Sequence, residues 1–400
     1  RGIMLQGSAQ GLVRLRGIAA KVHTGNMITK DHMSTGNGTD HYCINVQGAD
    51  GTYTVSSIFG VGDPITMNVN EAEGTVSITP QVLFTNSTYG EVWLCSMDLV
   101  NKYYSTTTPL TGTIDSEGKI TLGSWGIVIV AGQYAGNAFA VYTDSEWVPS
   151  NAAITITDVN GESETYGSLI EQESANQITF YNFAGNGTPV SGTVTTDGTI
   201  KVPPQFISYN TMYGDLYCYA YDSAGKVSTS LPIVGTVSNS TISFGGWCVT
   251  VRGYTNMMYL GVKTCTVALT EGTTIKVPEA ITPSFEGEGT AASPYQISTP
   301  AHFEMLAQTV NNGNSYTGKS FVMTADIDMS QAGTAYTAIG DETAVFNGKF
   351  DGNGHTIKNL TIKGLGFNNI GLFGALGRNA EVSNITLTAC NITGSGTNLG

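Results

Sequence analysis

The sequence has 400 residues, of which 12% are charged and 40% hydrophobic, and its formal net charge at pH 7 is −14. This length predicts about two to four compact domains, and the apolar fraction is sufficient for packed cores, which excludes global disorder. The excess of acidic groups excludes nucleic acid as a partner and disfavours anionic lipid, because both present phosphate. No uninterrupted apolar run of about 20 residues occurs, so we expect no membrane-spanning segment.

Residues 1–42 differ from the rest of the chain in charge. They contain five lysine and arginine residues against two aspartates, so the remainder carries −17. The apolar run that starts at Leu12 is interrupted by arginines and is too short for a signal peptide. This region stays unassigned, with the tail of a preceding module as one interpretation.

One module occurs twice in the first two thirds of the chain. The segment GTVSITPQVLFTNSTYGEVW at 74–93 recurs as GTIKVPPQFISYNTMYGDLY at 198–217, an offset of 124 residues. Trp125 recurs as Trp247 at an offset of 122, as small loop deletions would produce. We therefore predict that the copies share one strand order and bury these tryptophans at matching sites. The predicted copies span residues 43–160 and 161–272.

Each copy has the hydrophobic pattern of short strands. Val76 and Ile78 alternate with Thr and Ser, and turn signals such as Asn186-Gly187 and Asp197-Gly198 separate such runs. No segment between residues 43 and 270 has a sustained helical face. Each module is therefore predicted to be an antiparallel β-sandwich or small barrel.

The six cysteines show no metal or redox motif. They are spread along the chain without a CxxC pair, and none aligns with another cysteine across the two copies. We expect each to be a small buried hydrophobic residue. A disulfide special to the second copy, among Cys218, Cys248 and Cys265, is left open.

The amino-acid composition changes after the second copy. Residues 273–289 are rich in Pro and Glu-Gly steps and are predicted to be a linker with a short strand. A helix is predicted over 300–311, with Thr299 as its cap, Pro300 at its first position, and apolar residues at helical spacing. Those apolar residues are Phe303, Leu306, Ala307 and Val310.

A second repeat begins after this helix. The strand-like segment 357–362 is echoed by 382–387 at an offset of 25 residues, with Gly and Asn at the intervening corners. A period of about 20–30 residues is typical of a parallel β-helix. Residues 290–400 are therefore predicted to be the start of such a β-helix, capped by the α-helix, so that the whole chain is all-β apart from that helix.

The same region resembles the opening of the GLUG-motif repeat regions of large bacterial surface proteins, especially those of gut anaerobes. The carrying segments are Ala325-Asp-Ile-Asp-Met329, Phe346-Asn-Gly-Lys-Phe-Asp-Gly-Asn-Gly-His-Thr-Ile357, Gly371-Leu-Phe-Gly374 and Val382-Ser-Asn-Ile385. Residues 43–270 resemble, more loosely, the tandem β modules that precede such regions. The resemblance implies a right-handed β-helix on the cell surface, with an adhesive or unassigned role.

No residue pattern predicts catalysis or a metal site. HExxH, GxSxG and P-loop motifs are absent from the sequence, and His302-Phe-Glu304 lies on the predicted helix without a second ligand motif. Asp326 and Asp351 begin Asx-rich stretches that lack the glutamate of a calcium loop, so turn formation explains them. We predict no catalytic residue, no metal ligand and no cofactor.

Aromatic residues are the strongest candidates for a binding surface. A sugar-stacking platform is one interpretation, and a strand with alternate core and exposed rings is the favoured one. The residues concerned are Trp93, Tyr103, Tyr104, Tyr217, Tyr219 and Tyr221.

The sequence thus predicts a secreted or cell-surface, adhesin-like binding protein that is not an enzyme. Its expected partner is a glycan or a surface protein, neither of which the sequence identifies. One alternative is the non-catalytic part of a polysaccharide-acting β-helix enzyme, or of another surface enzyme, whose catalytic region lies elsewhere. A structural spacer is the third interpretation.

Overall fold

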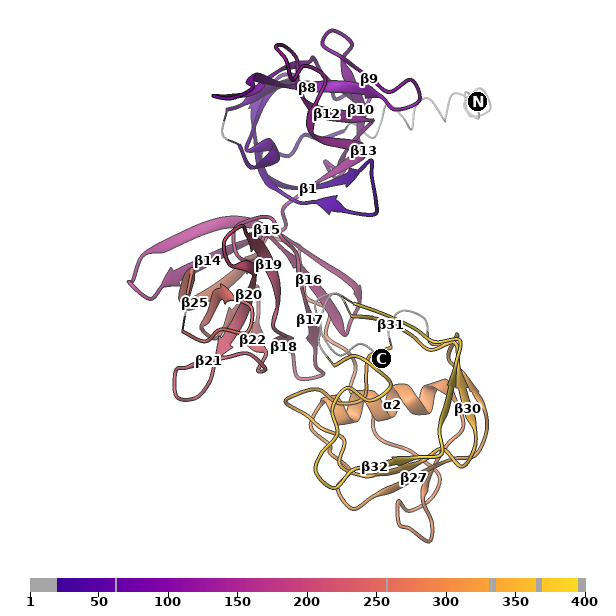
Figure 1. Ribbon diagram of the computed structural model, residues 1–400. Coiled ribbons are helices and arrows are strands. Elements are labelled where there is room, and N and C mark those ends of the chain that lie inside the picture. Colours follow the sequence, from indigo (N-terminus) through magenta and orange to yellow (C-terminus); the bar gives the residue numbers. More distant parts are fainter. Residues whose placement is uncertain are drawn as a thin grey trace, which may run out of the picture. The chain divides into compact units, whose positions relative to one another are not determined.

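The computed structural model describes residues 20–61, 63–256, 258–330, 332, 336–364 and 369–394. This described part of the chain is almost entirely β and contains two closed eight-stranded antiparallel barrels and one α-helix (Figure 1). Its contacts divide it into two compact units, with the main break after Ala153. The short segments Tyr166–Ile170 and Tyr181–Pro189 are grouped with the first unit.

The first barrel closes where its first strand pairs with its last, for example at Thr29 opposite Trp147. Its strands, in order around the barrel, are β1 (Gly25–Met33), β3 (Cys43–Ala49), β4 (Thr52–Ser56), β5 (Ile65–Asn70), β6 (Thr75–Ile78), β10 (Leu110–Ile114), β11 (Ile120–Leu122) and β13 (Ala138–Pro149). Further strands extend the sheet beyond β13 or flank it: β12 (Trp125–Ile129), β8 (Gly90–Asp98), β7 (Gln81–Asn86), β9 (Tyr103–Ser105) and β2 (Thr39–Asp40), with the 3-10 turn η1 (Ile58–Gly60).

The second barrel repeats this arrangement, and β14 pairs with β25 to close it. Its strands are β14 (Ala152–Asp158), β15 (Ser163–Ser174), β16 (Gln177–Tyr181), β17 (Val190–Val194), β18 (Thr199–Val202), β22 (Ile233–Ser238), β23 (Thr241–Phe244) and β25 (Leu260–Leu269). The extension consists of β24 (Trp247–Val251), β20 (Gly214–Tyr221), β19 (Gln205–Asn210) and β21 (Val227–Ser228).

The two barrels have the same strand order, which confirms the prediction of a repeated module. Trp125 and Trp247 begin the equivalent strands β12 and β24, and both are 0% exposed, as predicted. The apolar residues that alternate with polar ones in the sequence fill the interiors of the barrels. In β5, for example, Ile65, Met67 and Val69 are buried while the residues between them are exposed.

Two strand glycines at equivalent places allow the sheet to pack closely. A Cβ atom on Gly112 of β10 would collide with the carbonyl oxygen of Thr121 on the neighbouring strand. A Cβ atom on Gly235 of β22 would lie 2.6 Å from a ring carbon of Phe244. A side chain would therefore have to displace the neighbouring strand at Gly112 and the Phe244 ring at Gly235.

The C-terminal region contains three small parallel sheets and the helix α2 (Pro300–Asn311). The sheets comprise β26 (Tyr295–Ile297), β27 (Ser320–Met323), β29 (Lys349–Asp351) and β32 (Glu381–Ser383); β28 (Ile327–Asp328), β30 (Thr356–Lys358) and β33 (Thr386–Thr388); and β31 (Thr361–Gly364) and β34 (Asn391–Gly394). The helix lies beside these sheets in Figure 1, and Phe303, Leu306 and Val310 are buried in their shared core.

The helix prediction is confirmed in detail. The side chain of Thr299 accepts a hydrogen bond from the backbone N–H of His302 at 3.2 Å, and Pro300 occupies the first helical turn. His302 turns back on the same cap, where its Nδ1 accepts from the N–H of Ser298 at 3.0 Å. This imidazole therefore serves the helix start.

The predicted fold class needs one correction. The modules are closed barrels, one of the two architectures left open by the sequence, but the predicted parallel β-helix is wrong, because the region contains only small parallel sheets. The strands there are two to four residues long. Between β28 and β29, isolated bridges such as Ile339–Phe373 replace regular strands among the described residues. A regular coil requires a repeated strand at each such position.

The elements also locate the module ends. β1 begins at Gly25, inside the region left unassigned, and β14 begins at Ala152, inside the predicted first copy. β25 ends at Leu269, and residues 273–289 contain no strand, unlike the short strand predicted there.

Candidate functional site

The aromatic residues considered for a sugar-stacking platform differ in their exposure. Tyr217 and Tyr219 are 5% and 3% exposed and stack on each other, with the Arg252 guanidinium 5.0 Å from the Tyr217 ring centre. The hydroxyl of Tyr219 accepts a hydrogen bond from the N–H of Gly253 at 2.9 Å. Tyr103, on β9 of the first barrel, is 56% exposed. The buried rings therefore pack the protein, in line with the favoured interpretation.

A different aromatic cluster forms at a matching hairpin of both barrels. In the β7–β8 turn, the Asn86 side-chain oxygen accepts hydrogen bonds from the N–H groups of Thr88 and Tyr89 at 2.8 and 3.1 Å. In the β19–β20 turn, Asn210 accepts from Met212 and Tyr213 at 2.9 and 3.0 Å. This Asx turn, followed by a glycine at positive φ, presents one tyrosine in the same way in each barrel.

A second hairpin lies next to each of these turns. β8 pairs antiparallel with β12, so that Val92, near the start of β8, faces Ile129 at the end of β12. In the second barrel Leu216 faces Val251 in the same way. The antiparallel register therefore brings the β7–β8 turn beside the β12–β13 hairpin, and the β19–β20 turn beside the β24–β25 hairpin.

We name the resulting clusters the first tip and the second tip. The first tip comprises Phe84, Tyr89, Tyr134 and Phe139, whose rings meet edge to face with centroids 5.1–5.7 Å apart. The second tip comprises Met212, Tyr213, Tyr254 and Tyr259, and the rings of Tyr213 and Tyr259 meet edge to face at 6.4 Å.

Several aromatic side chains of the two tips are substantially exposed to solvent. Tyr134 and Phe139 are 39% and 41% exposed, and Tyr213, Tyr254 and Tyr259 are 49%, 59% and 43% exposed. Edge-to-face contacts help to fix the orientation of the rings of the first tip and of Tyr213 and Tyr259, which still remain partly exposed to solvent. Such a clustered exposed aromatic surface is typical of a binding site.

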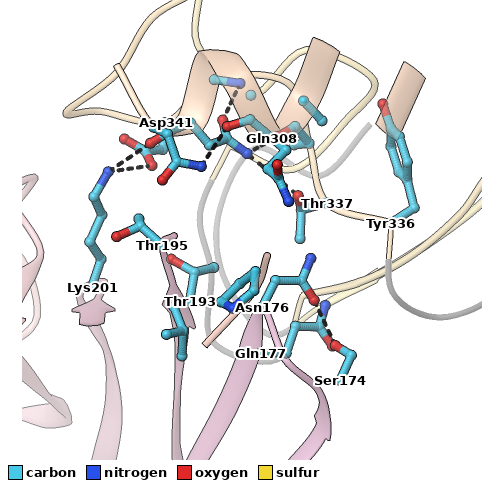
Figure 2. Close-up of a pocket in the computed structure, with 18 of the residues that line it drawn as sticks. Ser174, Asn176, Gln177, Thr193, Thr195, Lys201, Gln308, Tyr336, Thr337 and Asp341 are labelled. Carbon is cyan, nitrogen blue, oxygen red and sulfur yellow. Dashed lines mark hydrogen bonds and ion pairs between the residues drawn. The ribbon is translucent and has the colours of Figure 1, made fainter. Parts of the chain in front are cut away.

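Unit two also contains a cavity of about 540 Å³, shown in Figure 2. On one side it is lined by polar residues of the second barrel, among them Asn176, Thr193 and Lys201. Gln308 of α2 and Asp341 line the opposite side. Its size suits a small polar ligand.

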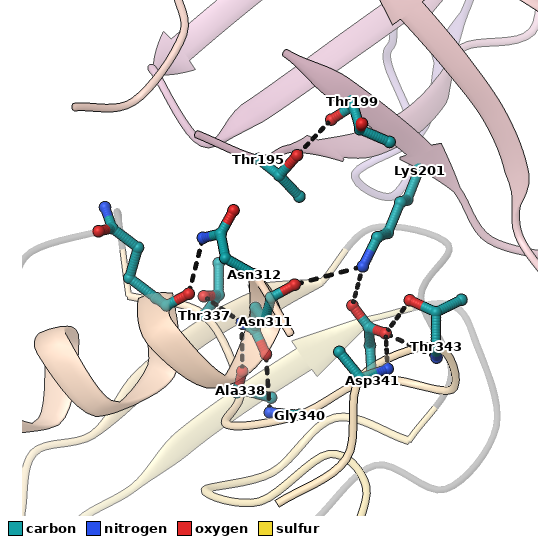
Figure 3. Close-up of polar contacts among 12 residues, drawn as sticks. Thr195, Thr199, Lys201, Asn311, Asn312, Thr337, Ala338, Gly340, Asp341 and Thr343 are labelled. Carbon is teal, nitrogen blue, oxygen red and sulfur yellow. Dashed lines mark hydrogen bonds and ion pairs between the residues drawn. The ribbon is translucent and has the colours of Figure 1, made fainter. Parts of the chain in front are cut away.

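Many polar groups around this cavity bond to one another (Figure 3). The Lys201 ammonium donates to a carboxylate oxygen of Asp341 at 3.2 Å and to the backbone oxygen of Asn311 at 3.3 Å. The Asn311 side chain donates to the carbonyl of Ala338 and accepts from the N–H of Gly340, at 3.0 and 2.8 Å. These bonds stabilise the cavity wall and leave fewer groups for a ligand.

The cavity lining also includes carboxyl groups and a phenol. Burial raises the pKa of Glu304 and of Glu342 above the usual range, and the neighbouring Asp341 adds to the effect at Glu342. The buried hydroxyl of Tyr336 has no hydrogen-bond partner among the described residues, and burial raises its pKa.

A buried carboxyl group lies inside the first barrel. Asp31 is 1% exposed and accepts a hydrogen bond from the indole N–H of Trp147 at 3.1 Å. Ser145, which also bonds Asp31, accepts from the indole N–H of Trp125 at 2.8 Å. Burial raises the pKa of Asp31 to about 6, although these hydrogen bonds act in the opposite direction.

The other titratable groups that the structure describes do not assemble into a metal site. Within the described part of the chain, no group of three or more His, Cys, Asp or Glu residues has metal-binding geometry. His355 pairs with Asp326 at 3.1 Å, and Asp351 accepts from the N–H of Asn353, as expected of turns. All six cysteines are free thiols, so Cys218, Cys248 and Cys265 form no disulfide. These three and Cys95 are buried as expected, whereas Cys43 and Cys390 are only partly buried.

Tyr89 and Tyr213 lie in the repeated segments 74–93 and 198–217, but the repeat alone did not predict either tip. A tip requires two hairpins that are about 40 residues apart in the chain, and only the antiparallel pairing brings them together. One available signal was the recurrence of aromatics in the second hairpin, at Tyr134 and Tyr254.

No family model matches the chain, so its resemblance to GLUG-motif proteins stays a prediction. Halomucin of Haloquadratum walsbyi is 35% identical over 125 residues, which cover 29% of this chain and 1% of halomucin. A putative Gly-rich membrane protein of Evansella cellulosilytica is 36% identical over 114 residues, which cover 28% of this chain and 13% of that protein. The chain therefore matches only a small part of each relative.

One solved structure aligns with 64% of the chain and 98% of its own length, at 10% identity. It is a protein of unknown function from the DUF3598 family of Nostoc punctiforme, and its TM-score of 0.17 is too low to show a shared fold. Among the described residues, no helix combines the length and the apolarity needed to cross a bilayer.

Proposed function

We propose that this chain is part of a surface-associated protein that acts by binding, in the manner of an adhesin, and not by catalysis. The main observation in support is that both barrels present an exposed aromatic tip on the same pair of hairpins. Contiguous exposed aromatic clusters are uncommon on soluble proteins, and they usually mark a surface that binds a partner.

The relatives support the surface association. One is named a mucin and the other a membrane protein, and each is at least 35% identical to part of this chain. The low content of charged residues in the sequence, 12%, fits a chain whose contacts depend on neutral polar and aromatic groups.

Two measurements test this function. Antibodies raised against the chain should label intact producing cells, and brief protease treatment of those cells should remove the label. The purified chain should also bind to a panel of immobilised glycans and surface proteins. Labelling that appears only after cell lysis, or a chain that binds nothing in the panel, would show that the proposed function is wrong.

A further inference from the structure

We propose that the two tips are saccharide-binding sites, each of which stacks a neutral sugar against its exposed rings. This inference rests on the proposed binding function and specifies its ligand. Three features of the tips support it: the uncharged segments that build them, their exposed rings, and the exposed amides in the same hairpins.

The four connecting segments that build the tips contain no charged residue. They are residues 86–90 and 130–137 in the first barrel and residues 210–214 and 253–259 in the second. The next charges along the chain are Glu91, Asp215 and Arg252; Glu91 accepts a hydrogen bond from Trp93, and Arg252 covers Tyr217. In a chain with a net charge of −14, four uncharged segments at two equivalent places favour an uncharged ligand.

The rings offer the contact that a sugar requires. A pyranose presents an apolar C–H face, and an aromatic ring provides a flat apolar surface of similar size whose negative face attracts C–H groups. Tyr134 in the first tip and Tyr254 in the second lie in the hairpin connections, where no strand covers them. Both are anchored through the backbone, since Asn137 N–H donates to the Tyr134 carbonyl and the Tyr254 N–H donates to the Val251 carbonyl.

Hydrogen-bonding groups stand beside the rings. Gln133 and Asn256 are exposed amides in the same hairpins as Tyr134 and Tyr254. Amides both donate and accept, so they match the hydroxyl groups around a sugar ring. A protein partner would instead be expected to meet a charged rim and arginine anchors, which these segments lack.

The test is affinity electrophoresis of the full chain in native gels that contain a neutral glucan, mannan or galactan, with polygalacturonate as the charged comparison. We expect at least one neutral polysaccharide to retard the wild-type chain. Tyr134→Ala with Phe139→Ala removes the first tip, and Tyr213→Ala with Tyr259→Ala removes the second. Each pair should weaken binding about tenfold or more, and all four together should abolish retardation.

Two further sets of variants control for folding. Tyr103→Ala removes an aromatic ring that is 56% exposed outside the tips and should leave retardation unchanged. Because Phe139 lies within β13, Tyr134→Ser and Tyr254→Ser repeat the test in the connections alone. Thermal melting of every variant shows whether the barrels remain folded.

The outcomes separate the two proposals. If a neutral polysaccharide retards the wild type and the folded tip variants equally, the tips are not the site, and the binding function stands. If only polygalacturonate retards the chain, or if the tips mediate self-association or bind a protein instead, the ligand class is wrong. If the chain binds no glycan, surface protein or cell, the proposed function itself fails.

Discussion

Gln81 and Gln205 make the same three hydrogen bonds in the two barrels. The side-chain oxygen of Gln81 accepts from the N–H of Thr66, and its amide donates to the carbonyls of Thr66 and Thr79, at 2.9–3.0 Å. Gln205 bonds to Ser191 and Pro203 in the same way, at 2.8–3.0 Å. Each glutamine thus links the extension strand that carries a tip hairpin to its barrel wall.

Replacement of Gln205 by alanine should lower the free energy of unfolding by about 1–3 kcal/mol, because buried backbone groups lose their partners. Gln81→Ala should cost less, since Gln205 is 4% exposed and Gln81 is only half-buried. Gln47→Ala, at an exposed strand position, should change stability by less than about 0.5 kcal/mol. Urea titration measures all three, and a loss for Gln205→Ala no larger than that for Gln47→Ala would contradict the structural role of this glutamine.

Removal of either buried tryptophan should destabilise its own barrel. Trp125→Ala and Trp247→Ala should each cost about 3–5 kcal/mol, the usual loss for a buried large aromatic. Since the two barrels need not unfold together, the unfolding should be followed barrel by barrel, through amide exchange of the strands. A loss below about 1 kcal/mol in either barrel would disagree with the 0% exposure of these side chains.

Stability of the first barrel should depend on pH through Asp31. Its folded pKa of about 6 exceeds the ordinary value of 3.8, so the folded state retains the proton longer than the unfolded state does. The stabilisation of the folded state that comes from protonated Asp31 is complete below about pH 4. It is lost as the pH rises through 6, and the free energy of unfolding then falls by about 3 kcal/mol.

Asp31→Asn removes this ionisation. The difference in unfolding free energy between wild type and variant, measured by urea titration from pH 4 to pH 8, should therefore change in favour of the variant as the pH rises. A difference that stays constant over this range would show that Asp31 does not titrate within it.

The strand glycines should tolerate no side chain. Gly112→Ala should destabilise the first barrel by about 1–3 kcal/mol, because the new methyl group meets a backbone oxygen that cannot move independently of its strand. Gly123→Ala is the matched control, since its nearest neighbour would be 3.6 Å from the new atom. Thermal melting compares the two, and equal melting temperatures would contradict the close packing at Gly112.

Much of this protein follows from its sequence. The recurrence of Gly74, Gln81 and Trp125 as Gly198, Gln205 and Trp247 predicted two modules with one strand order, and the structure has them. The helix over 300–311 was also predicted with its cap, because capping and helical spacing are local properties of the chain.

Features that depend on pairing between strands distant in the sequence were decided by the tertiary structure. Alternation predicts strands but cannot show that β1 pairs with β13, more than 100 residues later, so it left sandwich and barrel open. The same limit hid the tips, which require two hairpins in antiparallel register. It also made the β-helix prediction wrong, since a recurring motif between residues 357 and 387 says where short strands lie but not that they form regular coils. Pairing between distant strands depends on closure and packing of the whole sheet, which no local pattern contains.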